Sequence, residues 1–156
     1  MRGRDIPPAV EAQYRFTALI TLGEGQPIRF AGGGSGQMTP VIGGTVIGDM
    51  DGLVLPLGAD RSRQVGATSR LDAHWVIRTR EDHVVQVHTT GFHRTSDDVD
   101  ARIAAGVPVE PGEYYFRLTS LFETDEPSLS WLTETQFVGV GEDLGDAIRI
   151  HFYAVT

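Results

Sequence analysis

Apolar and polar residues alternate along most of the chain, and an alternation of period two is typical of β-strands with one buried face. The segment YRFTALITL is the clearest case, because every second residue from Tyr14 to Leu22 is apolar. Glycine-rich stretches such as AGGGSGQ and GDMDG separate the alternating segments and predict loops and turns. Further strands are expected near residues 28–30, 41–47, 53–57, 71–79, 84–92, 113–123, 136–140 and 147–155.

One segment, SDDVDARIAAG, has the features of a short helix. Ser96 is a suitable N-cap, acidic residues follow it in the first turn, and Gly106 comes after the last turn. Roughly eight to ten short strands with one helix predict an all-β fold, either an antiparallel up-and-down β-barrel or a sandwich. We expect a polar, flexible leader over residues 1–13 and a single domain over residues 14–156, since no linker or internal repeat divides the rest.

The composition excludes several classes of function. The formal net charge of the 156-residue chain is −8, and no basic cluster interleaved with aromatic residues offsets it, so nucleic-acid binding is not expected. The chain has no cysteine, and all 13 basic residues are arginines, which excludes thiolate chemistry and Schiff bases on lysine. No apolar run reaches the ~20 residues needed to cross a bilayer, and the N-terminus lacks the core of a signal peptide. We therefore expect a cytoplasmic protein without a membrane partner.

The alternating segments 71–79 and 84–92 are expected to form a hairpin with a tight turn at Glu81 and Asp82. This register pairs Trp75 with His88 on the more apolar face, which should point into the barrel. The predicted inner face consists of Leu71, Ala73, Trp75, Ile77, Val84, Gln86, His88, Thr90 and Phe92. The same reasoning places Tyr114, Phe116, Leu118, Ser120, Phe122, Ile148, Ile150 and Phe152 inside.

The polar groups on the predicted inner face are candidates for a ligand site, because a buried polar group needs a hydrogen-bond partner. His88 would be the general acid/base, since an imidazole with an unperturbed pKa of about 6.5 exchanges protons near neutral pH. Tyr114 and Gln86 would hold a carbonyl or enolate oxygen of the substrate. Trp75 and Thr90 would line the cavity and contact the substrate. In the alternative arrangement these groups bond to one another and fill the barrel.

Four more candidates are expected in loops or at strand ends, where a barrel mouth would be assembled. Asp60, Arg61, Trp131 and Glu134 would contact a substrate there or would be ordinary turn residues. The pair Asp72 and His74 lies on the opposite face of its strand. It could act as an acid/base pair or simply belong to a solvated charged face.

No cofactor and no metal ion are expected. The chain has no phosphate loop, dinucleotide fingerprint, nucleophile elbow or zincin motif. Of its five histidines, His88 and His93 lie an odd number of residues apart, so a regular strand points them to opposite faces. A metal site would therefore need partners from other strands.

Five segments together resemble one protein family. They are PVIGGTVIG from Pro40, GLVLPLGAD ending at Asp60, LDAHWVIRT from Leu71, EYYFRLTSLFET from Glu113 and WLTETQFVGVG from Trp131. Their order and spacing resemble the domain-of-unknown-function 3237 family, also called uncharacterised protein family 0311. This resemblance implies a compact β-barrel of the calycin or allene-oxide-cyclase type that often self-associates, without an established reaction.

The chain departs from the pattern of that family at several positions. Arg61 stands where tryptophan is usual, the hairpin turn reads Glu81–Asp82 in place of Asp-Gly, and the aromatic residue expected near Gln86 is missing. A family ligand pocket would therefore be reshaped here. A two-residue turn without glycine is also unfavourable, and a slightly longer loop would relieve it.

Three functions are compatible with this sequence. The first is a cofactor-independent enzyme of the isomerase, cyclase or lyase type that acts on a mainly apolar small molecule in the barrel. The second is a noncatalytic binding or carrier protein that uses the same cavity, and the third is an interaction module with a filled interior. We also expect a homo-oligomer, most simply a dimer, because the family resemblance points that way and outer apolar residues need cover. Those predicted outer residues are Val76, Val85 and Val87.

Overall fold

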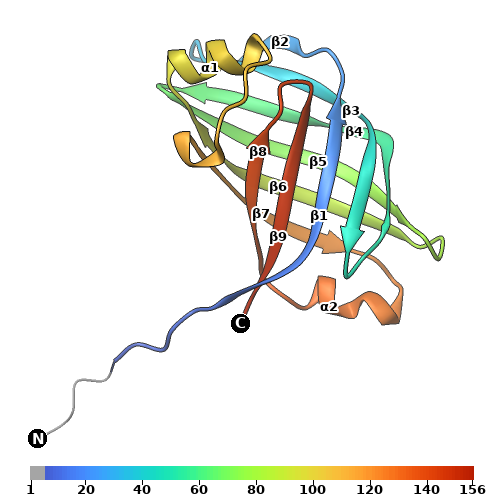
Figure 1. The fold of residues 1–156 in the computed structure, drawn as a ribbon. Coiled ribbons are helices and arrows are strands. Elements are labelled where there is room, and N and C mark those ends of the chain that lie inside the picture. Colours follow the sequence, from blue (N-terminus) through green and yellow to red (C-terminus); the bar gives the residue numbers. More distant parts are fainter. Residues whose placement is uncertain (1–5) are drawn as a thin grey trace, which may run out of the picture.

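The computed structural model describes residues 6–156, which form an antiparallel β-barrel. Eight strands close the barrel, and the short strand β2 extends it along the edge of β3 (Figure 1). The strands are β1 Ala12–Leu22, β2 Gln26–Arg29, β3 Ser35–Gly48, β4 Gly52–Val65, β5 Thr68–Thr79, β6 Val84–Arg94, β7 Tyr115–Glu123, β8 Phe137–Asp143 and β9 Ala147–Val155.

The strands follow an up-and-down order, in which neighbours in sequence from β3 to β9 are also neighbours in the sheet. Strand β1 closes the barrel because it pairs with β9 on one side and with β3 on the other. The predicted antiparallel barrel is thus confirmed. No helix among residues 6–156 is long and apolar enough to cross a bilayer. The first five residues of the predicted leader lie outside the described part, and β1 begins two residues before the predicted start of the domain.

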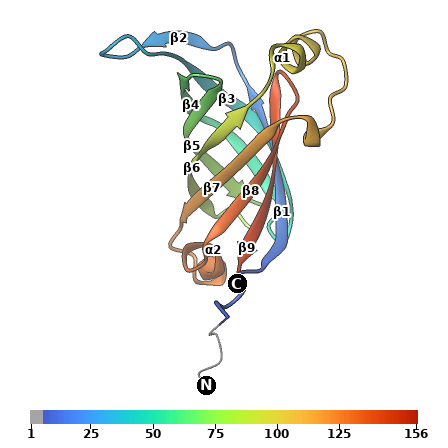
Figure 2. The same cartoon turned by 90° about the vertical axis from the view of Figure 1, so that its left-hand side faces the viewer.

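The predicted helix is confirmed as α1 Asp97–Ala104, whose first turn is capped by the Ser96 side chain accepting from the Val99 N–H. A second helix, α2 Ser130–Thr133, was not predicted because four residues are too few to show a helical period. Two 3₁₀ turns, η1 Pro111–Glu113 and η2 Pro127–Leu129, complete the connections. Helix α1 lies at the upper end of the barrel and α2 at the lower end (Figures 1 and 2).

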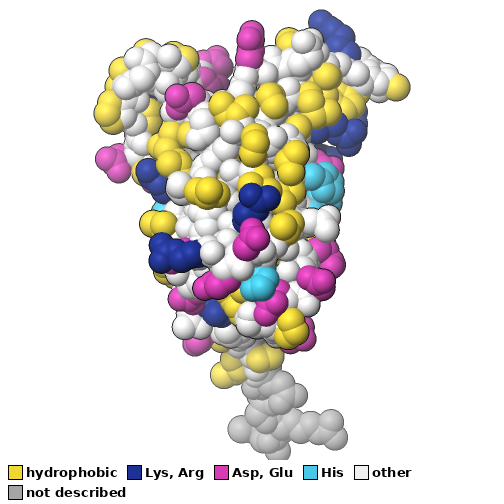
Figure 3. Space-filling model, turned by 90° about the vertical axis from the view of Figure 1, so that its right-hand side faces the viewer, with side chains coloured by type: hydrophobic (Ala, Val, Ile, Leu, Met, Phe, Trp, Pro, Cys, Tyr) yellow, Lys and Arg dark blue, Asp and Glu magenta, His cyan; other side chains and the backbone are white. Residues whose placement is uncertain are grey.

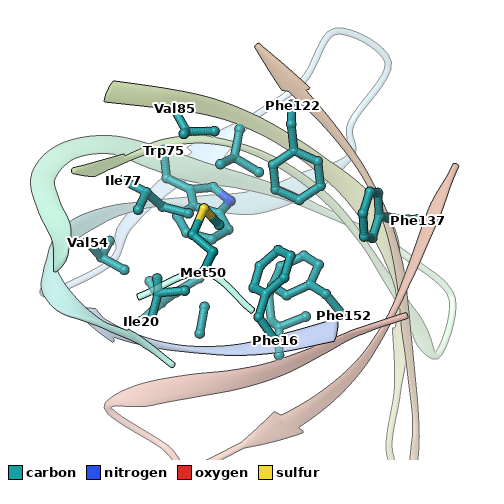
Figure 4. Close-up of a cluster of buried hydrophobic side chains, with 14 of the residues drawn as sticks. Phe16, Ile20, Met50, Val54, Trp75, Ile77, Val85, Phe122, Phe137 and Phe152 are labelled. Carbon is teal, nitrogen blue, oxygen red and sulfur yellow. The ribbon is translucent and has the colours of Figure 1, made fainter. Parts of the chain in front are cut away.

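Aromatic side chains form a cluster inside the barrel (Figure 4). The cluster reaches the end that carries α2, here called the lower half, because Phe16 and Phe137 contact Trp131 of α2. Phe16 stacks on Phe152 with ring centroids 4.6 Å apart, and Phe122 meets the edges of both rings. Trp75 is 2% exposed and packs beside Phe152. Burying each such side chain contributes about 1.5–3 kcal/mol, so this cluster is a main source of stability.

Strands β3 and β4 are longer than predicted, because bulges interrupt the alternation that the prediction followed. The pairing of β4 with β5 shifts between Val54 and Gly58, and Gly58 has a φ of 89°. A Cβ at Gly58 would collide with the carbonyl oxygen of His74. Asp60 and Arg61, which were expected in a loop or at a strand end, therefore lie within β4.

The predicted register of the β5–β6 hairpin is wrong by one residue. The Thr79 N–H donates to the His83 carbonyl at 2.8 Å, so the connection contains Arg80, Glu81 and Asp82. Asp82 alone adopts a positive φ, of 68°. A two-residue type I′ turn would need positive φ at two non-glycine residues, whereas a three-residue connection needs it at one, and aspartate tolerates it well.

This one-residue shift reverses the faces of β6, because successive side chains point to opposite sides of a strand. Trp75 pairs with Val87, and His74 pairs with His88. The inner face of β6 consists of Val85, Val87 and Thr89. The side chains predicted inside but found on the outer wall are Val84, Gln86, His88, Thr90 and Phe92, of which Val84 and Phe92 are 49% and 46% exposed.

The outer apolar residues also differ from the prediction, since Val85 and Val87 are buried. Hydrophobic side chains gather on the upper part of the face seen in Figure 3, and charged ones are more frequent below them. The large apolar side chains exposed on the strands include Ile42, Ile47, Leu53, Leu57, Val84, Phe92, Tyr115 and Leu121. Self-association remains a prediction.

Candidate functional site

The upper part of the barrel interior contains a pocket of about 550 Å³. It opens where the β1–β2 connection meets the turn between β8 and β9, at the end that carries α1 (Figure 1). Its apolar wall consists of Leu22, Leu71, Phe116 and Ile148. Its polar lining consists of Glu24, Gln37, Thr39, Asp60, His93, Asp143 and Asp146. Four of these groups are acids and none is an arginine, so the pocket favours a neutral or positively charged ligand over an anion.

Asp60 faces this pocket from β4, one side of its carboxylate held by the backbone of the neighbouring strand. Its Oδ1 accepts a hydrogen bond from the Asp72 N–H at 3.2 Å. Burial raises the pKa of Asp60 from 3.8 to about 6, because the charged form is poorly solvated there. The backbone hydrogen bond opposes this shift, and the charge of Asp72 adds to it. Asp60 can therefore gain or lose a proton close to neutral pH.

His93 enters the same pocket from β6. Its ring packs on the ring of Phe116, with centroids 4.7 Å apart, and beside that of Tyr114. Its Nε2 lies 3.4 Å from Asp143 Oδ2 but is not aligned for a hydrogen bond, and it has no hydrogen-bond partner among residues 6–156. Burial lowers the pKa of His93, although the charges of Asp143 and Asp100 oppose this. The neutral imidazole thus presents a buried nitrogen that a ligand could satisfy.

Tyr114 lies at the edge of the pocket, directly before β7, and its side chain contacts the end of β8. Its hydroxyl oxygen accepts the Asp143 N–H at 2.9 Å, where the direct pairing of β7 with β8 has ended. Burial is the main reason that the pKa of Tyr114 is raised, so the phenol keeps its proton at neutral pH. That proton is available to a ligand oxygen.

A linear chain of hydrogen bonds lies deeper in the barrel; it is called the closed chain here because all its members are buried in the core. Trp75 Nε1 donates to Thr89 Oγ1 at 3.0 Å, and the Thr89 hydroxyl bonds to that of Ser120 at 2.8 Å. Trp75, Thr89 and Ser120 are all buried. Each of these three side chains has a hydrogen-bond partner within the core, so the chain of hydrogen bonds stabilises the core.

The structure brings only part of the predicted site together. Asp60 lies in the pocket and Tyr114 at its edge, while Trp75 is inside but belongs to the closed chain. The predicted inward placement of His88, Gln86 and Thr90 is wrong, since all three lie on the outer wall. Arg61 is on the outer wall too, and Trp131 and Glu134 lie in and after α2, at the opposite end.

Trp131 packs at the end of the barrel that carries α2. It packs edge-on against Phe16 at 6.1 Å, and the Arg15 guanidinium lies 4.2 Å from its ring centroid. These contacts explain its partial burial without a ligand.

Sequence reasoning missed His93 and Asp143. A three-residue turn at the β5–β6 hairpin would have placed His93 inside, because it lies on the same face as Val87 and Thr89. Asp143 stands at the end of β8, and only the spacing of β7 and β8 in the barrel brings it to His93. No local pattern in the sequence indicates that contact.

Comparison with solved structures shows the same fold in several other proteins. A crystal structure of a conserved protein of unknown function, RPA1785 from Rhodopseudomonas palustris, has a TM-score of 0.87 at 29% identity and covers 97% of this chain and 100% of its own. A β-barrel-like protein from Acinetobacter baumannii has a TM-score of 0.82 at 26% identity, over 98% of this chain and 100% of its own. An enzyme from Penicillium herquei has a TM-score of 0.71 at 20% identity, with both chains fully covered, and this likeness concerns the fold alone.

The sequence itself has relatives of the same length. The UPF0311 protein RPA1785 is 31% identical over 150 residues, which cover 95% of this chain and 98% of the relative. The model of the family described as "Protein of unknown function (DUF3237)" matches residues 8–155. Because this match spans nearly the whole barrel, the chain belongs to the DUF3237 family.

Proposed function

We propose that the protein is a cofactor-independent enzyme, of the isomerase, cyclase or lyase type, that transfers a proton within a neutral or positively charged small molecule in the upper pocket. One observation carries this proposal: Asp60 and His93 line the same pocket, where burial raises the pKa of Asp60 to about 6 and lowers that of His93, so that both groups favour their uncharged forms. Titratable groups whose pKa values are tuned in this way are typical of acid–base catalysts.

The proposed chemistry assigns the base to Asp60. Its carboxylate takes a proton from a C–H or O–H group of the substrate, and the released electron pair forms a new double bond or attacks within the substrate. The carboxylic acid then returns the proton to another atom, so electrons and protons balance without a cofactor. Tyr114 would donate a hydrogen bond to an oxygen on which negative charge develops, and the neutral His93 would bind a polar group through Nε2.

The residues that line the pocket favour a substrate that is partly apolar. Leu22, Leu71, Phe116 and Ile148 offer an apolar surface, and the acids at the mouth disfavour an anion. A noncatalytic carrier would use the same surface, because binding alone needs apolar walls and a few oriented polar groups. The Penicillium herquei protein is described as an enzyme and has a similar fold, so catalysis is compatible with this architecture.

Solvent deuterium separates the two functions. Small molecules that copurify with the full chain are identified by mass spectrometry and then incubated with it in D₂O. The proposed enzyme converts the molecule or exchanges one of its C–H protons, which leaves a C–D bond as the permanent record, and Asp60→Asn abolishes this incorporation. A molecule that binds stoichiometrically and returns unchanged, with no deuterium on carbon, identifies a carrier and contradicts the proposal.

A further inference from the structure

Two histidines and one carboxylate face one another on the outer wall of β5 and β6. The observed register puts His74 directly opposite His88, and Asp72 lies two residues before His74 on the same face. The side chains come from two paired strands of a closed sheet, so their relative positions are set by a rigid backbone. This cluster lies on the outer face of the wall, whereas the residues of the upper pocket lie on its inner face, and the Asp72 N–H that donates to Asp60 links the two.

Both histidine side chains approach the same oxygen atom of Asp72. His88 Nε2 lies 2.8 Å from Asp72 Oδ1, and His74 Nε2 lies 4.0 Å from the same oxygen. The two imidazole rings are stacked, with centroids 4.1 Å apart and an interplanar angle of 10°. One possible ligand atom from each residue lies within 4.8 Å of the other two.

We propose that Asp72, His74 and His88 bind a divalent transition-metal ion, for which Zn²⁺ is the first candidate. Imidazole nitrogen and carboxylate oxygen are common ligands of Zn²⁺, Cu²⁺ and Ni²⁺ in proteins. Bond lengths of about 2.0–2.2 Å in a tetrahedral Zn²⁺ site separate the ligand atoms by roughly 3–3.5 Å. The observed distances of 2.8 and 4.0 Å lie on either side of that range. Because the stacked rings direct their Nε2 lone pairs nearly parallel, His74 has to turn out of the stack to bind the same ion as His88, and its side chain is 72% exposed.

The surroundings leave room for the remaining coordination positions. A shallow pocket of about 420 Å³, bordered by Met38, Ala59, Arg61, Asp72 and His74, can hold water or an added ligand of the metal. Arg61 is the nearby positive charge, and its guanidinium lies 4.0 Å from Asp72 Oδ2. Because Arg61 approaches Oδ2, the other oxygen, Oδ1, remains directed at the histidines. The net charge of −8 also favours the approach of a cation.

Isothermal titration calorimetry of the full, untagged chain with ZnCl₂, after chelator treatment and dialysis, tests this site. We expect one ion per chain. His74→Asn and His88→Asn should each lower the affinity by about 100-fold or more, since loss of an outer-shell partner alone costs about 10–100-fold. His151→Asn is the matched control: His151 Nε2 bonds to Glu142 Oε2 at 2.8 Å, as His88 does to Asp72, but no second imidazole is stacked on it. Its affinity should stay within about twofold of the wild type.

Two results would overturn the proposal. One is the absence of a binding isotherm with Zn²⁺, Cu²⁺ and Ni²⁺ alike, and the other is wild-type affinity in both His74→Asn and His88→Asn. If circular dichroism shows that a variant is unfolded, nuclear magnetic resonance of the wild type decides instead. Substoichiometric Cu²⁺ should broaden the imidazole signals of His74 and His88 first, and selective broadening of His83 or His151 would refute the assignment.

Discussion

The two halves of the barrel interior differ in how their polar groups are satisfied. In the lower half, Trp75, Thr89 and Ser120 bond to one another among packed aromatic rings. In the upper half, the pKa of Asp60 is raised by burial, and His93 has a buried nitrogen without a hydrogen-bond partner among residues 6–156. A core whose polar groups are hydrogen-bonded stabilises the fold. Buried polar groups that lack hydrogen bonds contribute less to stability but are available to bind a ligand. We therefore expect the lower half to contribute stability, and we propose the upper half as the ligand site.

The largest effect is expected for Asp60→Asn, which keeps the shape of the side chain and removes the base. Turnover of the substrate should fall by about 10²–10⁴-fold, the range for loss of a general base. Steady-state kinetics on the identified substrate measure it. Asp82→Asn, at the exposed hairpin turn where asparagine tolerates the positive φ, is the control and should keep full turnover. Full turnover in Asp60→Asn would remove the upper pocket from the mechanism.

The lower half should respond in stability instead. Phe152→Ala removes a ring that contacts Phe16, Trp75 and Phe122, and it should lower the free energy of unfolding by about 3–5 kcal/mol. Denaturant unfolding monitored by circular dichroism provides the value. The exposed ring of Phe92 offers the contrast, because Phe92→Ala should change stability by less than about 1 kcal/mol. Equal losses at both positions would contradict the assigned faces.

A smaller effect, at two neighbouring threonines, tests the register of β6. Thr89→Val leaves the buried Trp75 N–H without an acceptor and should cost about 1–3 kcal/mol. Thr90→Val affects an exposed hydroxyl that bonds to Thr119, and it should change stability by about 0.5 kcal/mol or less. The same unfolding measurement serves both variants. A larger loss for Thr90→Val would instead support a register that turns Thr90 and His88 inward.

These two threonines also show what the sequence can predict and what it cannot. The period-two alternation was sufficient to predict the strands of a barrel, because this prediction depends only on the pattern within each strand. The face of β6 depended on whether the hairpin connection has two residues or three, and a difference of one residue reverses every side chain. Thr89 and His93 were therefore missed in favour of Thr90 and His88.

Asp60 was correctly included in the candidate site, although its predicted place in a loop was wrong. The bulge at Gly58, which resets the alternation of β4, depends on close contact with the His74 backbone and has no reliable signal in one sequence. The contact between His93 of β6 and Asp143 of β8 depends on how the sheet curves into a barrel. Such contacts between distant strands exceed what local periodicity can predict.

The raised pKa of Asp60 also makes stability depend on pH. The folded protein binds this proton more tightly than the unfolded chain does, because the pKa is about 6 in the fold and 3.8 in its absence. The contribution of Asp60 to the free energy of unfolding should therefore fall as the pH rises from about 4 to about 6, and remain low above that range. Asp60→Asn should lack this component, so its stability relative to the wild type should rise over the same interval. Parallel pH profiles of thermal unfolding for the two proteins would contradict the shift.

The most direct test of the proposed role of the upper half needs no substrate. The ¹³Cγ signal of Asp60, identified by its absence in Asp60→Asn, can be followed by nuclear magnetic resonance across a pH titration of the wild type. The account predicts a midpoint at about pH 6, raised by burial in the pocket. A midpoint near the ordinary value of 3.8 would show a well-solvated carboxylate and would contradict the central claim.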